Sequence, residues 1–230
     1  MLHPTNTPPS ATSVLVAADA LATRKSAFWD RAARKYAADP IADQAGYEAT
    51  VQRVQALLSS DQNVLEVGCG TRSTALRLAA GTRSLLTTDV SPAMIEIAKE
   101  KLVAQPVAQL SFEVADADEP IKGSYDAVLA FNVLHLVSDL DRCIAFVAQS
   151  LKPGGLFISK TPCLKEISPL ITRLALPVMR AIGKAPHVLC FGKDHLLSAF
   201  TRQGLDIVSV ERHGTRGKDF RVFIVARKAG

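Results

Sequence analysis

The segment from residue 63 to residue 73 constrains the fold more than any other part of this sequence. A mostly apolar run, Val64–Val67, ends in Gly68 and Gly70, which is the pattern of a buried parallel strand that turns sharply into a helix. Glycine tolerates positive φ angles and lets a ligand approach the backbone, and the first amides of a helix are unpaired donors. The segment therefore predicts the nucleotide-binding corner of a doubly wound α/β sheet.

The glycine spacing in this segment departs from two common nucleotide-binding loops. A dinucleotide loop has the pattern Gly-x-Gly-x-x-Gly, and this sequence has Ser73 at the third glycine position. The pattern Glu/Asp-x-Gly-x-Gly-x-Gly is typical of loops that bind S-adenosylmethionine (SAM). Here Glu66, Gly68 and Gly70 match it, but Arg72 stands at its last glycine position. The glycine spacing does not distinguish a dinucleotide site from a SAM site, so the charged residues around the turn are the next criterion.

Three carboxylates belong to three successive apolar runs: Glu66 sits in the first, and Asp89 and Asp116 end the second and third. Asp89 lies 19 residues after Gly70 (89 − 70 = 19), where an acid at the tip of the second strand binds ribose hydroxyls. A rim of carboxylates repels a pyrophosphate, whereas SAM carries a sulfonium cation and no phosphate. The charge pattern favours SAM.

Five motifs, in this order, resemble those of the class I SAM-dependent methyltransferases of the small-molecule type. They are Val64–Arg77, Asp89–Met94, Asp116–Asp118, Tyr125–Val128 and Leu151–Gly155. One glycine loop is a weak signal, but five motifs in the right order are specific. The resemblance covers roughly residues 28 to 160. It implies methyl transfer from SAM to a small-molecule acceptor, with S-adenosylhomocysteine (SAH) as the product.

The resemblance and the periodicity together predict one domain over residues 26–230. Its expected fold is a doubly wound, mostly parallel, seven-stranded sheet that ends in an antiparallel hairpin. Two alternating runs, Leu205–Arg212 and Phe220–Arg227, predict that hairpin. Dinucleotide dehydrogenases typically continue with parallel βα units instead, so the hairpin favours a methyltransferase. Residues 1–25 are expected to form a flexible tail before an amphipathic helix at Ser26–Ala38.

The resemblance also implies which residues hold the cofactor. Tyr36 is expected to face the methionine end, and the Asp116 carboxylate to bind the adenine amino group. Met94 lies against the adenine in the family, and a core position is the alternative. A turn cap is the alternative for Asp116. The expected cofactor residues are Tyr36, Glu66, Gly68, Cys69, Gly70, Thr71, Asp89, Val90, Met94, Asp116, Ala117 and Asn132.

The acceptor side is expected to involve residues 162–193, an apolar stretch broken by prolines. We interpret it as a substrate lid around an apolar pocket that includes Met179, with Arg173 and Arg180 available to an anionic group. Ordinary packing over the sheet is the alternative.

His135 is the candidate general base, with a buried structural imidazole as the alternative. Weaker candidates are Lys160, His187 and His195. Because the methyl group of SAM is already activated, proximity and orientation suffice and no base is required. Only Asp139 and Asp141 offer carboxylates near the fourth strand, so no metal is expected.

Composition narrows the remaining alternatives. The chain has 230 residues, of which 48% are hydrophobic, and none of its apolar runs approaches the ~20 residues of a membrane span. Four cysteines without paired spacing favour reduced thiols and a cytoplasmic location. The net charge of +5 is not concentrated in one run, and nucleic acid is not expected as a partner.

Three alternatives stay open at this point, and the oligomeric state is not predicted. A lipid-like acceptor at a membrane surface is compatible with the apolar lid and the basic helix. A non-catalytic SAM-binding or partner-binding protein is suggested by Arg72. An NAD(P)-dependent oxidoreductase is the third.

Overall fold

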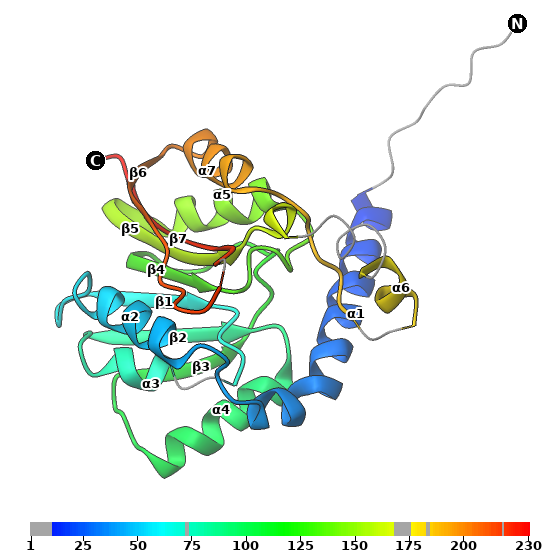
Figure 1. Ribbon diagram of the computed structural model, residues 1–230, viewed down its shortest axis with the longest axis horizontal. Helices are drawn as coiled ribbons and strands as arrows, with labels where there is room; N and C mark the ends of the chain where they lie inside the picture. Colours follow the sequence, from blue (N-terminus) through cyan, green and yellow to red (C-terminus); the bar gives the residue numbers. More distant parts are fainter. Residues whose placement is uncertain (1–10, 72–73, 168–175, 183–184, 218) are drawn as a thin grey trace, which may run out of the picture.

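The computed structural model contains one seven-stranded sheet in the order β3-β2-β1-β4-β5-β7-β6 (Figure 1). It describes residues 11–71, 74–167, 176–182, 185–217 and 219–230. The strands are β1 (Asn63–Val67), β2 (Ser84–Asp89), β3 (Leu110–Val114), β4 (Tyr125–Phe131), β5 (Leu151–Pro162), β6 (Leu205–Glu211) and β7 (Arg221–Lys228). The first five strands pair in parallel, and β7 is antiparallel to both β5 and β6. The predicted fold class, including the hairpin at the edge of the sheet, is confirmed.

Helices cover both faces of this sheet (Figure 1). One face carries α2 (Gln44–Gln55), α3 (Thr74–Ala79) and α4 (Pro92–Ala104), and the other carries α5 (Leu140–Ser150) and α7 (Lys193–Arg202). Two of these helices begin at a side-chain cap of a type that favours helix starts. Ser91 Oγ accepts a hydrogen bond from Met94 N at 3.1 Å, and Asp139 Oδ1 accepts one from Arg142 N at 3.1 Å.

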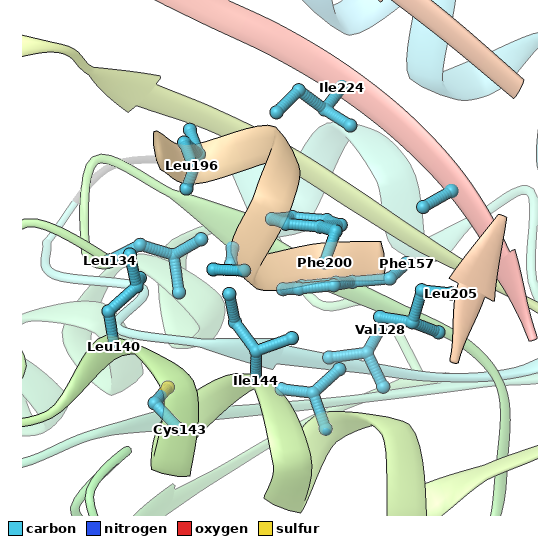
Figure 2. Close-up of a cluster of buried hydrophobic side chains, with 14 of the residues drawn as sticks. Val128, Leu134, Leu140, Cys143, Ile144, Phe157, Leu196, Phe200, Leu205 and Ile224 are labelled. Atoms are coloured by element: carbon cyan, nitrogen blue, oxygen red, sulfur yellow. The ribbon is translucent and has the colours of Figure 1, made fainter. Parts of the chain in front are cut away.

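The core between the sheet and the pair α5 and α7 is built from aliphatic and aromatic side chains (Figure 2). At its centre the rings of Phe157 and Phe200 stack with centroids 4.8 Å apart and an interplanar angle of 11°. Ile158, the next residue of β5, is buried in the separate core on the opposite face. Apolar packing on both faces explains why Leu156–Ile158 of β5 are consecutive apolar residues.

The N-terminal helix is longer than the sequence predicts. Helix α1 (Ala11–Ala38) begins at Ala11 rather than at Ser26, so a flexible tail over residues 1–25 is wrong for residues 11–25. The alanines between residues 17 and 22 favour a helix, and Lys25 makes tertiary contacts that the sequence does not signal. Residues 1–10 lie outside the described part of the chain.

Two short elements occupy the predicted lid, residues 162–193. They are a 3₁₀ helix, η1 (Leu164–Glu166), and α6 (Leu176–Ala181). Residues 168–175 and 183–184 of this stretch lie outside the described residues. None of the helices in the described ranges is long and apolar enough to cross a membrane.

Candidate functional site

One pocket crosses the carboxyl ends of the five parallel strands. Each strand contributes a lining residue within two residues of this end, and in sheet order these are Asp116, Asp89, Gly68, Asn132 and Lys160. β1 pairs with β2 on one side and with β4 on the other, so the direction of winding changes at β1. Ligands of open α/β sheets bind at such a switch point.

The turn after β1 contains two glycines with positive φ angles and is held in place by the Asp89 carboxylate. Gly68 and Gly70 have φ angles of 67° and 57°. A Cβ on Gly68 would lie 2.4 Å from Val133 Cγ2, so a side chain there would force Val133 to shift. Asp89 Oδ2 accepts a hydrogen bond from Gly70 N at 2.8 Å, and Asp89 Oδ1 accepts one from Ser91 N at 2.9 Å. Asp89 therefore ties this turn to the start of α4.

Glu66 lies at the floor of the pocket with its side chain almost completely buried. Its residue is 3% exposed, and its Oε2 atom has no hydrogen-bond partner among the described residues. Burial, together with the nearby charge of Asp89, raises the pKa of the Glu66 carboxyl to about 8. A cation in the pocket would offer this carboxyl the partner that it lacks.

Asp116 pairs with a lysine from the far N-terminal helix. Lys25 Nζ donates to Asp116 Oδ1 at 2.8 Å and also contacts the carboxylate of Asp118. Asp118 in turn accepts hydrogen bonds from Ser138 N and Oγ. Although burial opposes it, hydrogen bonding to Lys25 and Ser138 lowers the pKa of Asp118. This network anchors α1 beside the loop that follows β3.

Helix α1 forms one wall of the pocket. Trp29 and Tyr36 line it, with ring centroids 6.1 Å apart in an edge-on arrangement. Asp30 accepts hydrogen bonds from Ser91 Oγ and from Ala93 N at the start of α4. An acidic side chain at a helix N-terminus is favourable, which stabilises this docking.

Where β4 and β5 end, the pocket is lined by a second buried polar side chain, that of Lys160. Lys160 Nζ donates to Thr50 Oγ1 of α2 at 2.7 Å, and Lys160 is 6% exposed. Burial, and then the positive charge of Arg221, lowers the pKa of the Lys160 amine. The carboxylate of Asp43 also lines this end and accepts hydrogen bonds from Gly46 N and Thr215 N.

The structure brings almost all of the predicted cofactor residues together in this pocket. Those that line it are Tyr36, Glu66, Gly68, Cys69, Gly70, Asp89, Val90, Met94, Asp116, Ala117 and Asn132. Thr71 is buried but does not line the pocket, so the structure does not place it with the others. Asn132 has a positive φ of 56°, which marks a tight turn after β4.

The predicted catalytic and acceptor residues lie elsewhere. His135 is not among the residues that line the pocket, and burial lowers the pKa of its imidazole to about 4. Met179 and Arg180 are exposed on α6, with Met179 43% exposed, and neither lines the pocket. Arg173 and Arg72 lie outside the described residues. Their predicted roles therefore stay predictions.

Several lining residues were not predicted from the sequence. They are Lys25, Trp29, Ile41, Asp43, Tyr47, Thr50, Thr74, Ala115, Phe131, Val133, Leu136, Val137 and Arg221. Those from α1, α2 and β7 are distant in sequence from the glycine turn and carry no local motif. Of the weaker base candidates, only Lys160 lines the pocket. The described residues contain no group of His, Cys, Asp and Glu side chains that could hold a metal ion.

Comparison with known proteins relates part of the chain to a protein family. Residues 65–159, which run from β1 into β5, match the family described as methyltransferase domain. The hybrid PKS-NRPS synthetase mpsA of Macrophomina phaseolina is 36% identical over 119 residues, which cover 45% of this chain and 3% of that protein. Magnesium-protoporphyrin O-methyltransferase of Rhodobacter capsulatus is 37% identical over 71 residues, which cover 31% of this chain and 32% of that protein. The chain thus spans a third or less of the length of these two curated relatives.

A solved structure extends the likeness to most of the chain. Magnesium protoporphyrin IX methyltransferase (ChlM) from Synechocystis PCC 6803, crystallised with bound SAH, matches with a TM-score of 0.67 at 18% identity. The match covers 92% of this chain and 99% of that chain. At this level of identity the likeness shows the fold. Residues 65–159 thus resemble a methyltransferase domain, and the chain has the fold of solved class I SAM-dependent methyltransferases.

Proposed function

We propose that this protein is an enzyme that transfers the methyl group of SAM to a small organic acceptor. The observation that carries this proposal is the row of carboxylates Glu66, Asp89 and Asp116, which line one pocket along β1, β2 and β3. Closely spaced carboxyl groups disfavour the phosphates of a dinucleotide. A cationic ligand favours the ionised form of Glu66, whose pKa is otherwise raised to about 8. SAM is cationic at its sulfonium and at its amino group.

The residues of this half of the pocket fit SAM. The partnerless Oε2 of Glu66 suits a cationic group, and Gly68 leaves the backbone open to close approach. Asp89 and Asp116 stand where a ribose and an adenine amino group would be bound. When bound, SAM supplies a methyl group that is already activated by the sulfonium.

The chain's own contribution is positioning and exclusion of water. Trp29 and Tyr36 of α1 cover the pocket beside the glycine turn. Holding two reactants in the correct orientation accounts for up to ~7–11 kcal/mol of a barrier in favourable cases. A general base adds about 10²–10⁴-fold only where the acceptor must lose a proton. No described titratable residue needs to act as a base for this proposal.

The acceptor is proposed to be small and partly apolar. Ile41, Phe131, Leu136 and Val137 line the pocket and provide apolar surface. Two of the similar proteins are named for magnesium protoporphyrin, which is an organic small molecule.

A SAH-release assay with a panel of small acceptors tests the proposal. The wild-type protein should form SAH faster with at least one acceptor than without any. Asp89→Ala should abolish this activity, and the exposed Asp61→Ala, outside the pocket, should retain it. Binding of SAM without turnover on any acceptor would favour the non-catalytic alternative. Binding of NADH in place of SAM would favour the oxidoreductase.

A further inference from the structure

Lys160 lines the pocket where β4 and β5 end, and it has no carboxylate partner among the residues that the structure describes. Its Nζ donates to Thr50 Oγ1 at 2.7 Å and contacts Gly46 O at 3.4 Å. An ammonium carries three N–H donors, so at least one of them has no acceptor among the described residues. A buried cation without an anionic partner is costly, and this cost falls when an anion binds.

The charged groups near Lys160 do not supply that partner. No carboxylate of the described residues lies within salt-bridge distance of its Nζ. Asp43 already accepts hydrogen bonds from Gly46 N and from Thr215 N and Oγ1. Asp219 accepts hydrogen bonds from Gly214 N and from Arg221 N and Nε. Arg221 has the same charge sign as Lys160, so it adds to the attraction for an anion.

The position of Lys160 assigns it to the acceptor and not to the cofactor. It lies near the end of β5, two strands away from β1 and on the side opposite to β2 and β3. Asn132 N donates to Lys160 O at 2.8 Å, so the two residues stand together where β4 and β5 end. Apolar lining by Ile41 and Phe131 at this end suits a ligand with an apolar body.

This inference rests on the proposed function and deepens it. We propose that Lys160 is the specificity-determining residue that pairs with a carboxylate of the acceptor, so that the acceptor is an apolar organic acid. A carboxylate fits better than a phosphate, because one ammonium with one open donor matches a single negative charge. The carboxylates of Asp43 and Glu66 would oppose a dianion in the same pocket.

Matched pairs of probes test the inference on the SAH-loaded protein. Each pair is an aryl or alkyl carboxylic acid and the primary amide of the same carbon skeleton, such as 2-naphthoate and 2-naphthamide. Binding is measured by saturation-transfer NMR and then by titration. The wild-type protein should bind acids at least tenfold more tightly than their amides. Lys160→Met should lose this preference while retaining the affinity for SAH within twofold.

Lys152→Met is the matched control, because Lys152 belongs to the same strand but pairs with Asp126 and does not line the pocket. It should bind acids as the wild type does. Thermal unfolding of Lys160→Met, with Lys160→Gln as a second variant, verifies that the fold is intact. Equal binding of acids and amides, no binding of any acid, or an unchanged preference in both Lys160 variants would overturn the inference. Failure of the wild type to bind SAH would instead count against the proposed function.

Discussion

Lys25 Nζ lies 2.8 Å from Asp116 Oδ1, although 91 residues separate them in the sequence. This ion pair joins α1 to the loop after β3. It also engages the carboxylate that the sequence predicts as the adenine contact. Helix α1 therefore lines the pocket. Its Lys25 also binds the Asp116 carboxylate, so a ligand that binds Asp116 competes with Lys25.

Replacing Lys25 should destabilise the protein more than replacing an exposed lysine. Lys25→Met leaves Asp116 and Asp118, whose side chains are 13% and 14% exposed, without their cation. We expect the free energy of unfolding to fall by about 1–3 kcal/mol in urea denaturation at pH 7. Lys99→Met changes the net charge equally, but Lys99 is exposed and lies 3.6 Å from Glu96, so about 0.5 kcal/mol or less is expected. Equal losses in the two variants would contradict the anchoring of α1 by Lys25.

Glu66 should make stability and ligand binding depend on pH in opposite directions. The pKa of this carboxyl rises from 4.5 to about 8 on folding, so its contribution to stability is present below pH 4.5 and is lost as pH rises to 8. Glu66→Gln removes this pH-dependent loss of stability. Between pH 4.5 and pH 8, the free energy of unfolding of the variant should therefore rise relative to that of the wild type by up to about 1.4 kcal/mol per pH unit.

The same Glu66→Gln substitution should weaken SAM binding at least tenfold at pH 8.5, because the neutral amide cannot balance a cation. In the wild type, SAM binding should tighten from pH 6 to pH 8.5 as Glu66 ionises. Unfolding curves and calorimetric titrations across this range measure both effects, with the exposed Glu119→Gln as the control. A variant that loses stability above pH 7, or that binds SAM as the wild type does, would contradict this role of Glu66.

A methyl group on Gly68 should cost more than one on another glycine with positive φ. Gly68→Ala places Cβ 2.4 Å from Val133 Cγ2, whereas Gly154, at φ 75°, has no atom within 4 Å of the added Cβ. Gly154→Ala should therefore lower the free energy of unfolding only by the cost of a positive φ in a residue with a Cβ, about 1–2 kcal/mol. Gly68→Ala should exceed this loss by about 1–3 kcal/mol, because the clash must be relieved inside the core. Chemical denaturation of both variants measures the difference, and equal losses would show that Val133 yields without strain.

The sequence predicts one half of the pocket well. Glu66 lies near the end of one apolar run, Asp89 and Asp116 end the next two, and parallel strands bring such ends to one edge of the sheet. The glycine turn and the caps at Ser91 and Asp139 depend only on neighbouring residues. Local patterns of this kind can be recognised in the sequence alone.

The other half depends on contacts between distant segments. Lys25 reaches Asp116 from α1, and Lys160 reaches Thr50 across 110 residues. Neither contact has a local signature, since a lysine in a helix or near the end of a strand usually faces solvent. The sequence names Lys160 only as a weak candidate for a base. Its burial, with no carboxylate partner in the described ranges, suggests an acidic acceptor and appears only in the folded chain.

Titration calorimetry with SAM, SAH and NADH distinguishes a SAM site from a dinucleotide site. We expect SAM and SAH each to bind at a ratio of one per chain, and NADH, at the same concentrations, to give no heat of binding. The rim of Glu66, Asp89 and Asp116 is the physical reason for this selectivity. Binding of NADH, or no heat with either SAM or SAH, would contradict the account.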